Sequence, residues 1–220
     1  MLPTPSTRSV DFEKVYEPAE DSFLLLDALE LERESLVTRF RDCPLVVEIG
    51  TGSGIVTSFV HSQILPCGLF ITTDVNIHAC RASLNTSKEN GGTRYVDTLR
   101  ATLTSSIRPF LVDVLIFNPP YVPNEAVPEL PNDDSSNSWL DLALEGGKDG
   151  MEVTQMLLVN LEQILSTNGV AYILFCKRNH PESVAQHMHE SGWTVTLVCE
   201  RKAAWEVLSV WRFERPKSSG

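Results

Sequence analysis

A strand, a glycine loop and a helix follow one another between residues 44 and 65, and this unit constrains the fold more than any other part of the chain. The apolar run 44–49 predicts a short buried strand, Gly50-Thr51-Gly52-Ser53-Gly54 follows at once, and Ile55–Leu65 has helical periodicity. Glycines let the backbone turn tightly and approach a ligand closely. This unit is typical of open α/β sheets, in which ligands bind beyond the carboxyl ends of the strands.

Two details distinguish the loop from a dinucleotide site. Ile55 stands where the fingerprint G-x-G-x-x-G needs its last glycine, and Glu48 before the loop would repel a pyrophosphate but suits a cationic ligand. Twenty residues after Gly54, an apolar run ends in Asp74, which is placed to accept hydrogen bonds from ribose hydroxyls. S-adenosylmethionine carries an ammonium and a sulfonium and no phosphate, so it fits this loop. The loop alone is a weak signal, because it can be no more than a tight turn.

A second motif, Asn118-Pro119-Pro120-Tyr121, directly follows the apolar run Val112–Phe117. Two prolines end the predicted strand, because neither can donate to a sheet ladder. The Asn118 carboxamide oxygen and a proline carbonyl can each accept one N–H, and Tyr121 offers a flat apolar face. This set suits the transfer of an activated group onto an amide or amine nitrogen without an acid, a metal or a nucleophile.

With these motifs, the chain resembles the HemK-like glutamine methyltransferases within the class I S-adenosylmethionine-dependent methyltransferases. The likeness is greatest to the eukaryotic branch that methylates the peptide chain release factor of translation termination. It covers nearly the whole chain, and the motifs lie in family order. The matching strings are Val15-Tyr16-Glu17-Pro18-Ala19-Glu20-Asp21-Ser22, Glu48–Gly54, Thr73–Asn76, Phe117–Pro123 and Ala143-Leu144-Glu145-Gly146-Gly147-Lys148-Asp149-Gly150.

The resemblance implies a site for S-adenosylmethionine and its substrate. Cofactor binding is implied for Tyr16, Pro18, Glu20, Asp21, Ser22, Glu48, Gly50, Gly52, Gly54, Asp74, Val75, Thr102, Leu103 and Asn118. Catalysis is implied for Asn118, Pro119, Pro120 and Tyr121, and these four with Val122 are implied to bind the substrate. Glu20, Asp21 and Ser22 could also cap the first helix, and both roles can hold together.

One position departs from the family. Relatives usually place an aspartate after the third strand, where it can accept a hydrogen bond from the adenine amine, and Thr102 stands there in this chain. A hydroxyl can still accept, but a neutral hydrogen bond is weaker by roughly a factor of two. We therefore expect weaker cofactor binding without loss of activity.

The charge balance bears on the substrate. The net charge is −11 and no basic run occurs, whereas nucleic-acid binding depends on phosphate neutralisation by lysine and arginine. Nucleic acid is therefore disfavoured and a basic protein favoured. The resemblance implies N5-methylation of the glutamine in a Gly-Gly-Gln loop of the release factor. An adenine-N6 nucleic-acid methyltransferase, a protein-lysine (histone) methyltransferase and a non-enzymatic module that kept the fold are the alternatives.

The resemblance also implies a partner. Eukaryotic members are similar in working as heterodimers with a small zinc-binding activator, which covers an apolar surface and a sheet edge. Arg94–Leu99 is the candidate edge strand, because an uncovered edge invites pairing. Whether the release factor is recognised with its GTP-binding companion is left open.

Other features bound the class of protein. The five cysteines are scattered without a Cys-x-x-Cys pair, which fits a reducing compartment and not a disulfide framework or a zinc site. No metal site is expected, because His187 and His189 point to different sides of a helix. No stretch has the length of a membrane span and no signal peptide is present, so we expect a cytoplasmic protein, with the nucleus as an additional compartment left open.

The organisation predicted is one α/β methyltransferase domain over residues 1–220, with a Rossmann-like, seven-stranded, mostly parallel sheet and an antiparallel C-terminal edge hairpin. Residues 1–15 are expected to form a flexible arm, and 123–150 a substrate-side loop that is either a lid or a tolerated insertion. Predicted strands are Leu45–Ile49, Leu69–Asp74, Arg94–Leu99, Val112–Phe117, Val170–Cys176, Thr194–Glu200 and Trp205–Phe213. Predicted helices are Glu20–Phe40, Ile55–Leu65, Ile77–Asn90, Met151–Leu165 and Pro181–Ser191.

Overall fold

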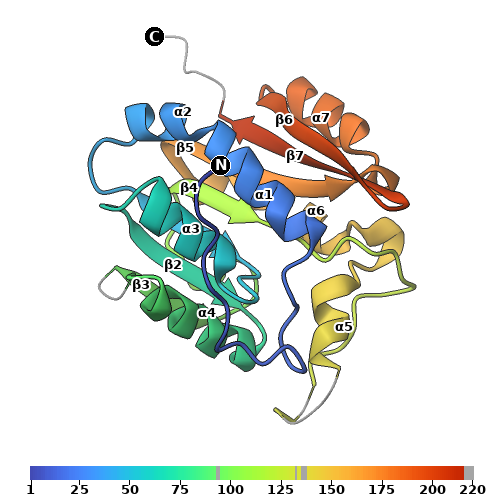
Figure 1. Ribbon diagram of the computed structural model, residues 1–220. Helices are drawn as coiled ribbons and strands as arrows, with labels where there is room; N and C mark the ends of the chain where they lie inside the picture. Colours follow the sequence, from blue (N-terminus) through green and yellow to red (C-terminus); the bar gives the residue numbers. More distant parts are fainter. Residues whose placement is uncertain (93–94, 132, 135–137, 216–220) are drawn as a thin grey trace.

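The sheet has the strand order β3-β2-β1-β4-β5-β7-β6, and β7 runs antiparallel to both of its neighbours while the other pairs are parallel. The computed structural model describes residues 1–92, 95–131, 133–134 and 138–215 (Figure 1). This architecture confirms the predicted fold class. The strands are β1 (Leu45–Ile49), β2 (Leu69–Asp74), β3 (Val96–Arg100), β4 (Val112–Phe117), β5 (Leu165–Cys176), β6 (Thr194–Ala203) and β7 (Glu206–Glu214).

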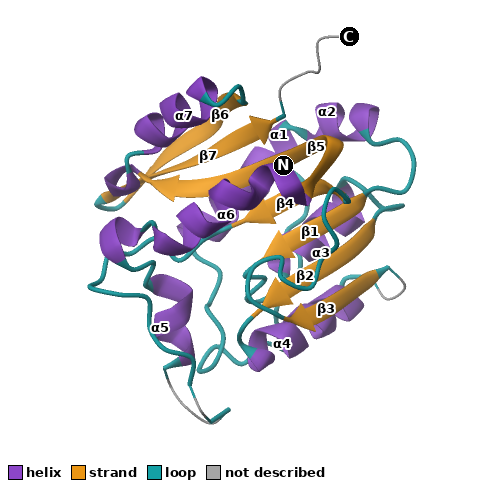
Figure 2. Ribbon diagram, turned by 180° about the vertical axis from the view of Figure 1, so that it is seen from behind, coloured by secondary structure: helices purple, strands orange, loops and turns teal. Residues whose placement is uncertain are grey.

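Helices cover the sheet on both faces. Alternate residues of β4 point to opposite faces, so Ile116 packs with the helices α1 and α3, and Leu115 with α6 (Figures 1 and 2). No helix among the described residues is long and apolar enough to cross a membrane. The helices are α1 (Glu20–Leu31), α2 (Arg33–Arg39), α3 (Ile55–Gln63), α4 (Ile77–Glu89), α5 (Trp139–Leu144), α6 (Glu152–Ile164) and α7 (Pro181–Glu190), with short 3-10 turns η1 (Lys148–Gly150) and η2 (Lys177–Asn179).

Several predicted elements need correction. The helix predicted over Glu20–Phe40 is two helices, α1 and α2, which meet at Glu32. In α1, Phe23 and Leu31 are 39% and 67% exposed, while Leu25 and Leu29 are buried.

The bounds of four strands also differ. Strand β6 extends to Ala203 instead of Glu200, and β7 spans Glu206–Glu214 instead of Trp205–Phe213. Strand β5 begins at Leu165 instead of Val170, because Leu165 pairs with Val112 across an irregular stretch of the ladder. Strand β3 spans Val96–Arg100, and Arg94 of the predicted strand lies outside the described residues.

The N-terminal segment 1–15 lies along the helices α1 and α4 (dark blue in Figure 1). The Leu2 N–H donates to the Glu30 carboxylate at 2.9 Å, and Ser6 and Asn90 exchange two hydrogen bonds of 2.9 Å. The flexibility of this arm and the single domain over 1–220 stay predictions.

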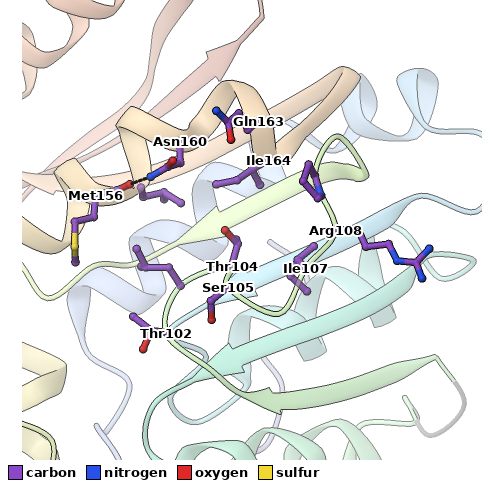
Figure 3. A pocket seen from close by; sticks show the side chains of 12 residues that line it. Thr102, Thr104, Ser105, Ile107, Arg108, Met156, Asn160, Gln163 and Ile164 are labelled. Carbon is purple, nitrogen blue, oxygen red and sulfur yellow. Dashed lines mark hydrogen bonds between the residues drawn. The ribbon is translucent and has the colours of Figure 1, made fainter.

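The connection from β3 to β4, residues 101–111, contains no helix. Leu103 and Ile107 pack in the same core cluster as α6, so this connection crosses the sheet face opposite α3 and α4 (Figure 2). A cavity of about 310 Å³ lies between it and α6, with Thr102, Arg108 and Asn160 among its lining residues (Figure 3). On this face, a loop covers β1 and β2 where a doubly wound fold would place a helix.

Candidate functional site

A cavity of about 320 Å³ lies at the carboxyl ends of β1, β2, β3 and β4. The segments that follow these strands, the N-terminal arm, the segment 127–143 and α6 all contribute to its wall. The structure therefore brings together predicted site residues that are far apart in the chain. Those that line it are Tyr16, Asp21, Gly50, Gly52, Asp74, Val75, Thr102, Leu103, Asn118, Pro119 and Pro120.

Seven predicted site residues do not line the cavity: Pro18, Glu20, Ser22, Glu48, Gly54, Tyr121 and Val122. Glu20 is exposed and lies 3.8 Å from Arg201, and Pro18 is half-buried. Ser22 is buried and donates its backbone N–H and its hydroxyl to Asp21, so it acts on the site through that carboxylate.

The glycine loop folds tightly against β2. Gly50 and Gly52 have positive φ angles of 62° and 50°, and the Gly50 N–H donates to the Thr73 carbonyl at 2.8 Å. Gly54 has a φ of 77°, and a Cβ there would lie 2.5 Å from the Ser83 Cα. Gly54 therefore permits the close packing of α3 on α4, while Gly50 and Gly52 face the cavity.

Glu48 lies beneath the loop and not in the cavity wall. Its carboxylate accepts hydrogen bonds from the Thr57 N–H at 2.9 Å, from the Thr57 hydroxyl and from the Thr51 hydroxyl at 3.2 Å. Burial raises the pKa of Glu48 to about 7, although these hydrogen bonds oppose the shift. Through these hydrogen bonds Glu48 links the glycine loop to the first turn of α3. The sequence had suggested instead that its carboxylate faces a ligand.

Asp74 faces the cavity from the end of β2. Its carboxylate accepts hydrogen bonds from the Gly52 N–H at 3.1 Å and the Asn76 N–H at 2.8 Å. Burial raises the pKa of Asp74 to about 6. Each carboxylate oxygen can accept a second hydrogen bond, so the site suits ligand hydroxyls.

Asp21 sets the orientation of the Asn118 side chain. The Asn118 Nδ2 donates to Asp21 at 3.1 Å, and Asp21, which is 4% exposed, also accepts from the Ser22 N–H at 2.6 Å and the Tyr16 hydroxyl at 3.3 Å. A carboxylate can only accept, so the amide must turn its nitrogen toward Asp21. The Asn118 Oδ1 is then left buried, with no hydrogen-bond partner among the residues that the structure describes. Burial, and secondarily the charge of Asp21, raise the pKa of Tyr16.

The backbone after Asn118 is held by the segment 144–150. The Val122 N–H donates to the Leu144 carbonyl and the Gly146 N–H to the Val122 carbonyl, both at 2.9 Å. A Cβ on Gly146 would lie 2.2 Å from the Pro120 carbonyl oxygen, and one on Gly150 would lie 2.0 Å from the Tyr121 carbonyl oxygen. The glycines of this motif are therefore needed for contact with the Asn-Pro-Pro-Tyr backbone.

Tyr121 was expected to offer a flat face to the substrate. Its ring packs instead against the core cluster that contains α1 and α3, and burial raises its pKa. Its carbonyl accepts from the Asn179 Nδ2 at 3.0 Å, and the same nitrogen donates to the Asp149 carbonyl at 3.0 Å. Asn179 was missed from the sequence, because nothing in the pattern after β5 marks it.

The segment 123–150 was expected to be a substrate-side loop, either a lid or a tolerated insertion. Its described part lines the same cavity as Asp74 and Thr102, while residues 132 and 135–137 lie outside the described residues. Trp139 is 1% exposed, and the Arg100 guanidinium lies 5.6 Å from its ring centroid. The cavity-lining residues that the sequence did not single out include Val15, Asn76, Val127, Pro128, Leu130, Trp139, Leu142 and Met156.

The cavity wall contains polar groups that a ligand can satisfy. Thr73, Asn118 and Trp139 line the cavity, and each has a buried side-chain polar atom with no hydrogen-bond partner in the described part of the chain. Buried polar groups in proteins are almost always paired, so orphaned groups in a cavity wall indicate a ligand with matching groups. S-adenosylmethionine, with its ribose hydroxyls and adenine nitrogens, offers such groups.

Comparisons with known proteins agree with this geometry. The chain is 40% identical to the eRF1 methyltransferase catalytic subunit mtq2 of Schizosaccharomyces pombe, over 98% of this chain and 96% of that protein. It is 36% identical to the mouse methyltransferase HEMK2, over 97% of each chain. The E. cuniculi Mtq2–Trm112 complex, described as responsible for methylation of the eRF1 translation termination factor, is similar with a TM-score of 0.66 and 29% identity, covering 92% of this chain and 99% of that one. No protein-family model matches the chain.

Proposed function

Because the chain belongs to the methyltransferase family of mtq2 and HEMK2, we propose that it methylates the side-chain nitrogen of a glutamine in the eukaryotic peptide chain release factor. The glutamine is that of the Gly-Gly-Gln motif, and the methyl donor is S-adenosylmethionine. The observation that carries the proposal is the buried Asn118 Oδ1, which lacks a partner and is held in place by Asp21.

Asn118 acts on the substrate as a hydrogen-bond acceptor. A glutamine amide nitrogen is a poor nucleophile, because its lone pair is delocalised into the carbonyl group. The Asn118 Oδ1 and the Pro119 carbonyl accept its two N–H groups and orient the nitrogen for in-line attack. Orientation and stabilisation of developing charge together lower the barrier by several kcal/mol, on the order of what such positioning gives in enzymes. No general base is needed first, since the proton leaves after transfer.

The order of strands sets the direction in which the cofactor lies. Asn118 follows β4, the glycine loop follows β1, Asp74 ends β2 and Thr102 follows β3, and these four strands are neighbours in that order. The reacting end of the cavity is therefore at β4, Asp74 would hold the ribose hydroxyls, and Thr102 and Leu103 would hold the base. S-adenosylmethionine, when bound, supplies an activated methyl group on a sulfonium.

The proposed partner is a small zinc-binding activator subunit. Its support is the edge position of β3, the part of the sheet face that the loop 101–111 crosses in place of a helix, and a row of large apolar side chains. Leu69, Tyr95, Phe110 and Leu111 are each 46–57% exposed. These side chains lie at the amino ends of the parallel strands β2, β3 and β4. The E. cuniculi relative was solved as a complex with Trm112.

The experiment is co-expression of the chain with such an activator, followed by labelled methyl transfer to the release factor. The substrate is either wild type or carries Gly-Gly-Ala in place of Gly-Gly-Gln, with and without the GTP-binding companion. Label on the wild type alone supports the proposal. Equal label on both factors, or label on histone lysine or on nucleic-acid adenine instead, overturns the substrate. The proposal includes a cytoplasmic location, which imaging of the tagged protein tests.

A further inference from the structure

Trp139 is a buried residue whose indole has an unmet hydrogen-bonding group. It is 1% exposed, it lines the cavity at the strand ends, and its Nε1–H has no partner among the described residues. An indole nitrogen can only donate. An unpaired buried donor is unfavourable, so an acceptor belongs beside it when the site is in use.

Trp139 lies at the β3 end of the cavity. The guanidinium of Arg100, the last residue of β3, lies over its ring, and the Arg100 Nε donates to the carbonyl of the cavity-lining Val75 at 3.1 Å. Asp134, which belongs to the same segment 123–150 as Trp139, lies near Arg100 as well. Its carboxylate is 3.9 Å from the Arg100 guanidinium, and its backbone carbonyl is 2.7 Å from the His78 ring nitrogen. The segment 123–150 is thus attached to the end of the cavity where Thr102 and Leu103 also lie.

That end of the cavity is the base end of the proposed cofactor. Adenine has three ring nitrogens that accept hydrogen bonds, and its exocyclic amine donates. Thr102 offers a hydroxyl, which suits the amine, and Trp139 offers the donor that a ring nitrogen needs. The two side chains come from different elements and together provide complementary groups for a purine base.

We propose that the Trp139 Nε1–H donates a hydrogen bond to a ring nitrogen of the cofactor's adenine, so that Trp139 is a base-recognition residue supplied by the segment 123–150. This inference rests on the proposed use of S-adenosylmethionine. The segment 123–150 then helps to bind the cofactor, whereas its position after Asn-Pro-Pro-Tyr had suggested only a place on the substrate side. Arg100 is then a positioning residue, since it touches the ring of Trp139 and not the ligand.

The test is calorimetric binding of S-adenosylhomocysteine to the chain purified with its activator. Trp139→Phe keeps an aromatic ring beside Arg100 and removes the donor. We expect the Kd to rise by about two- to tenfold, the range that one neutral hydrogen bond gives. Trp193→Phe is the matched control, because Trp193 is also buried, at 8% exposure, but packs against the core beneath α7.

The 1-deaza, 3-deaza and 7-deaza analogues of the ligand separate a hydrogen bond from lost packing. In one of the three analogues, the nitrogen that accepts from Trp139 is replaced by carbon, and the wild-type protein should bind this analogue more weakly than it binds S-adenosylhomocysteine. The Trp139→Phe variant should bind both with equal affinity. The inference is overturned if Trp139→Phe has the same Kd for S-adenosylhomocysteine as wild type, or if the substitution weakens binding of every analogue by the same factor. Either result leaves the proposed use of S-adenosylmethionine standing. Failure of wild type to bind S-adenosylhomocysteine overturns the proposed cofactor itself.

Discussion

Replacing Asp21 by asparagine reverses the orientation that the structure gives to the Asn118 amide. The oxygen of the introduced amide stays with the Ser22 N–H, which makes the shortest contact to Asp21 at 2.6 Å. Its NH2 group then faces the Asn118 Nδ2, which lies 3.1 Å from the carboxylate in the wild type. Two donors repel, so Asn118 turns over and presents an NH2 group where its Oδ1 stood.

The expected loss follows from the contact that disappears. During transfer the glutamine nitrogen gains positive charge, so its hydrogen bond to the Asn118 Oδ1 becomes charge-assisted and is worth about 1.5–3 kcal/mol. This corresponds to a fall of about ten- to a hundredfold in kcat. Since the bond strengthens only in the transition state, KM should change much less than kcat.

The assay is single-turnover transfer of labelled methyl to the intact release factor, with cofactor affinity measured by calorimetry. Asp27→Asn is the matched control: it makes the same chemical change on the same helix, but Asp27 pairs with Arg201 and does not line the cavity. The control should keep wild-type rates. A kcat for Asp21→Asn within about threefold of wild type would refute the orientation argument.

Three further changes test other parts of the site. Thr102→Asp adds a charged acceptor at the base end and should lower the Kd for the cofactor by about two- to tenfold; equal affinities by calorimetry would contradict the assigned position of the adenine amine. Gly54→Ala should lower the free energy of unfolding in urea by about 2–4 kcal/mol, because its φ of 77° and the approach of Ser83 both oppose a Cβ, whereas Gly52→Ala, with no atom within 4 Å of its Cβ, should cost about 1–2 kcal/mol. Wild type should lose stability as pH rises from about 4.5 to about 7, because folded Glu48 keeps its proton in this range while the unfolded chain has released it. Glu48→Gln should remove that part of the slope, and identical unfolding curves against pH for the two proteins would show that the raised pKa is wrong.

Much of the sheet was predictable from local pattern. Strands β1, β2 and β4 have the bounds that the sequence predicts, and β1 and β4 are mainly apolar because these central parallel strands are buried on both faces. The start of β5 was missed, since Ser166, Thr167 and Asn168 are polar and their place in the strand depends on pairing with β4. Local composition cannot show a partner strand.

The site was predictable as a set of residues but not as an arrangement. Asp21 and Asn118 were each identified, yet their hydrogen bond joins positions 97 residues apart, and it decides which way the amide points. Glu48 was identified by its place before the glycine loop, but only the fold shows that Thr57 and Thr51 donate to its Oε2. Trp139 carries no motif, and its importance arises from burial beside Arg100.

The helix-free connection between β3 and β4 has a consequence for how the chain varies between species. A side chain on a sheet face normally changes in step with the helix that covers it, within one gene. On the face crossed by residues 101–111, we propose that the activator supplies the complementary surface. Substitutions at the exposed Phe110 or Leu111 should then be matched by substitutions in a second gene, and covariation between the two chains should concentrate on this strip while the glycine loop and Asn118 vary independently of it.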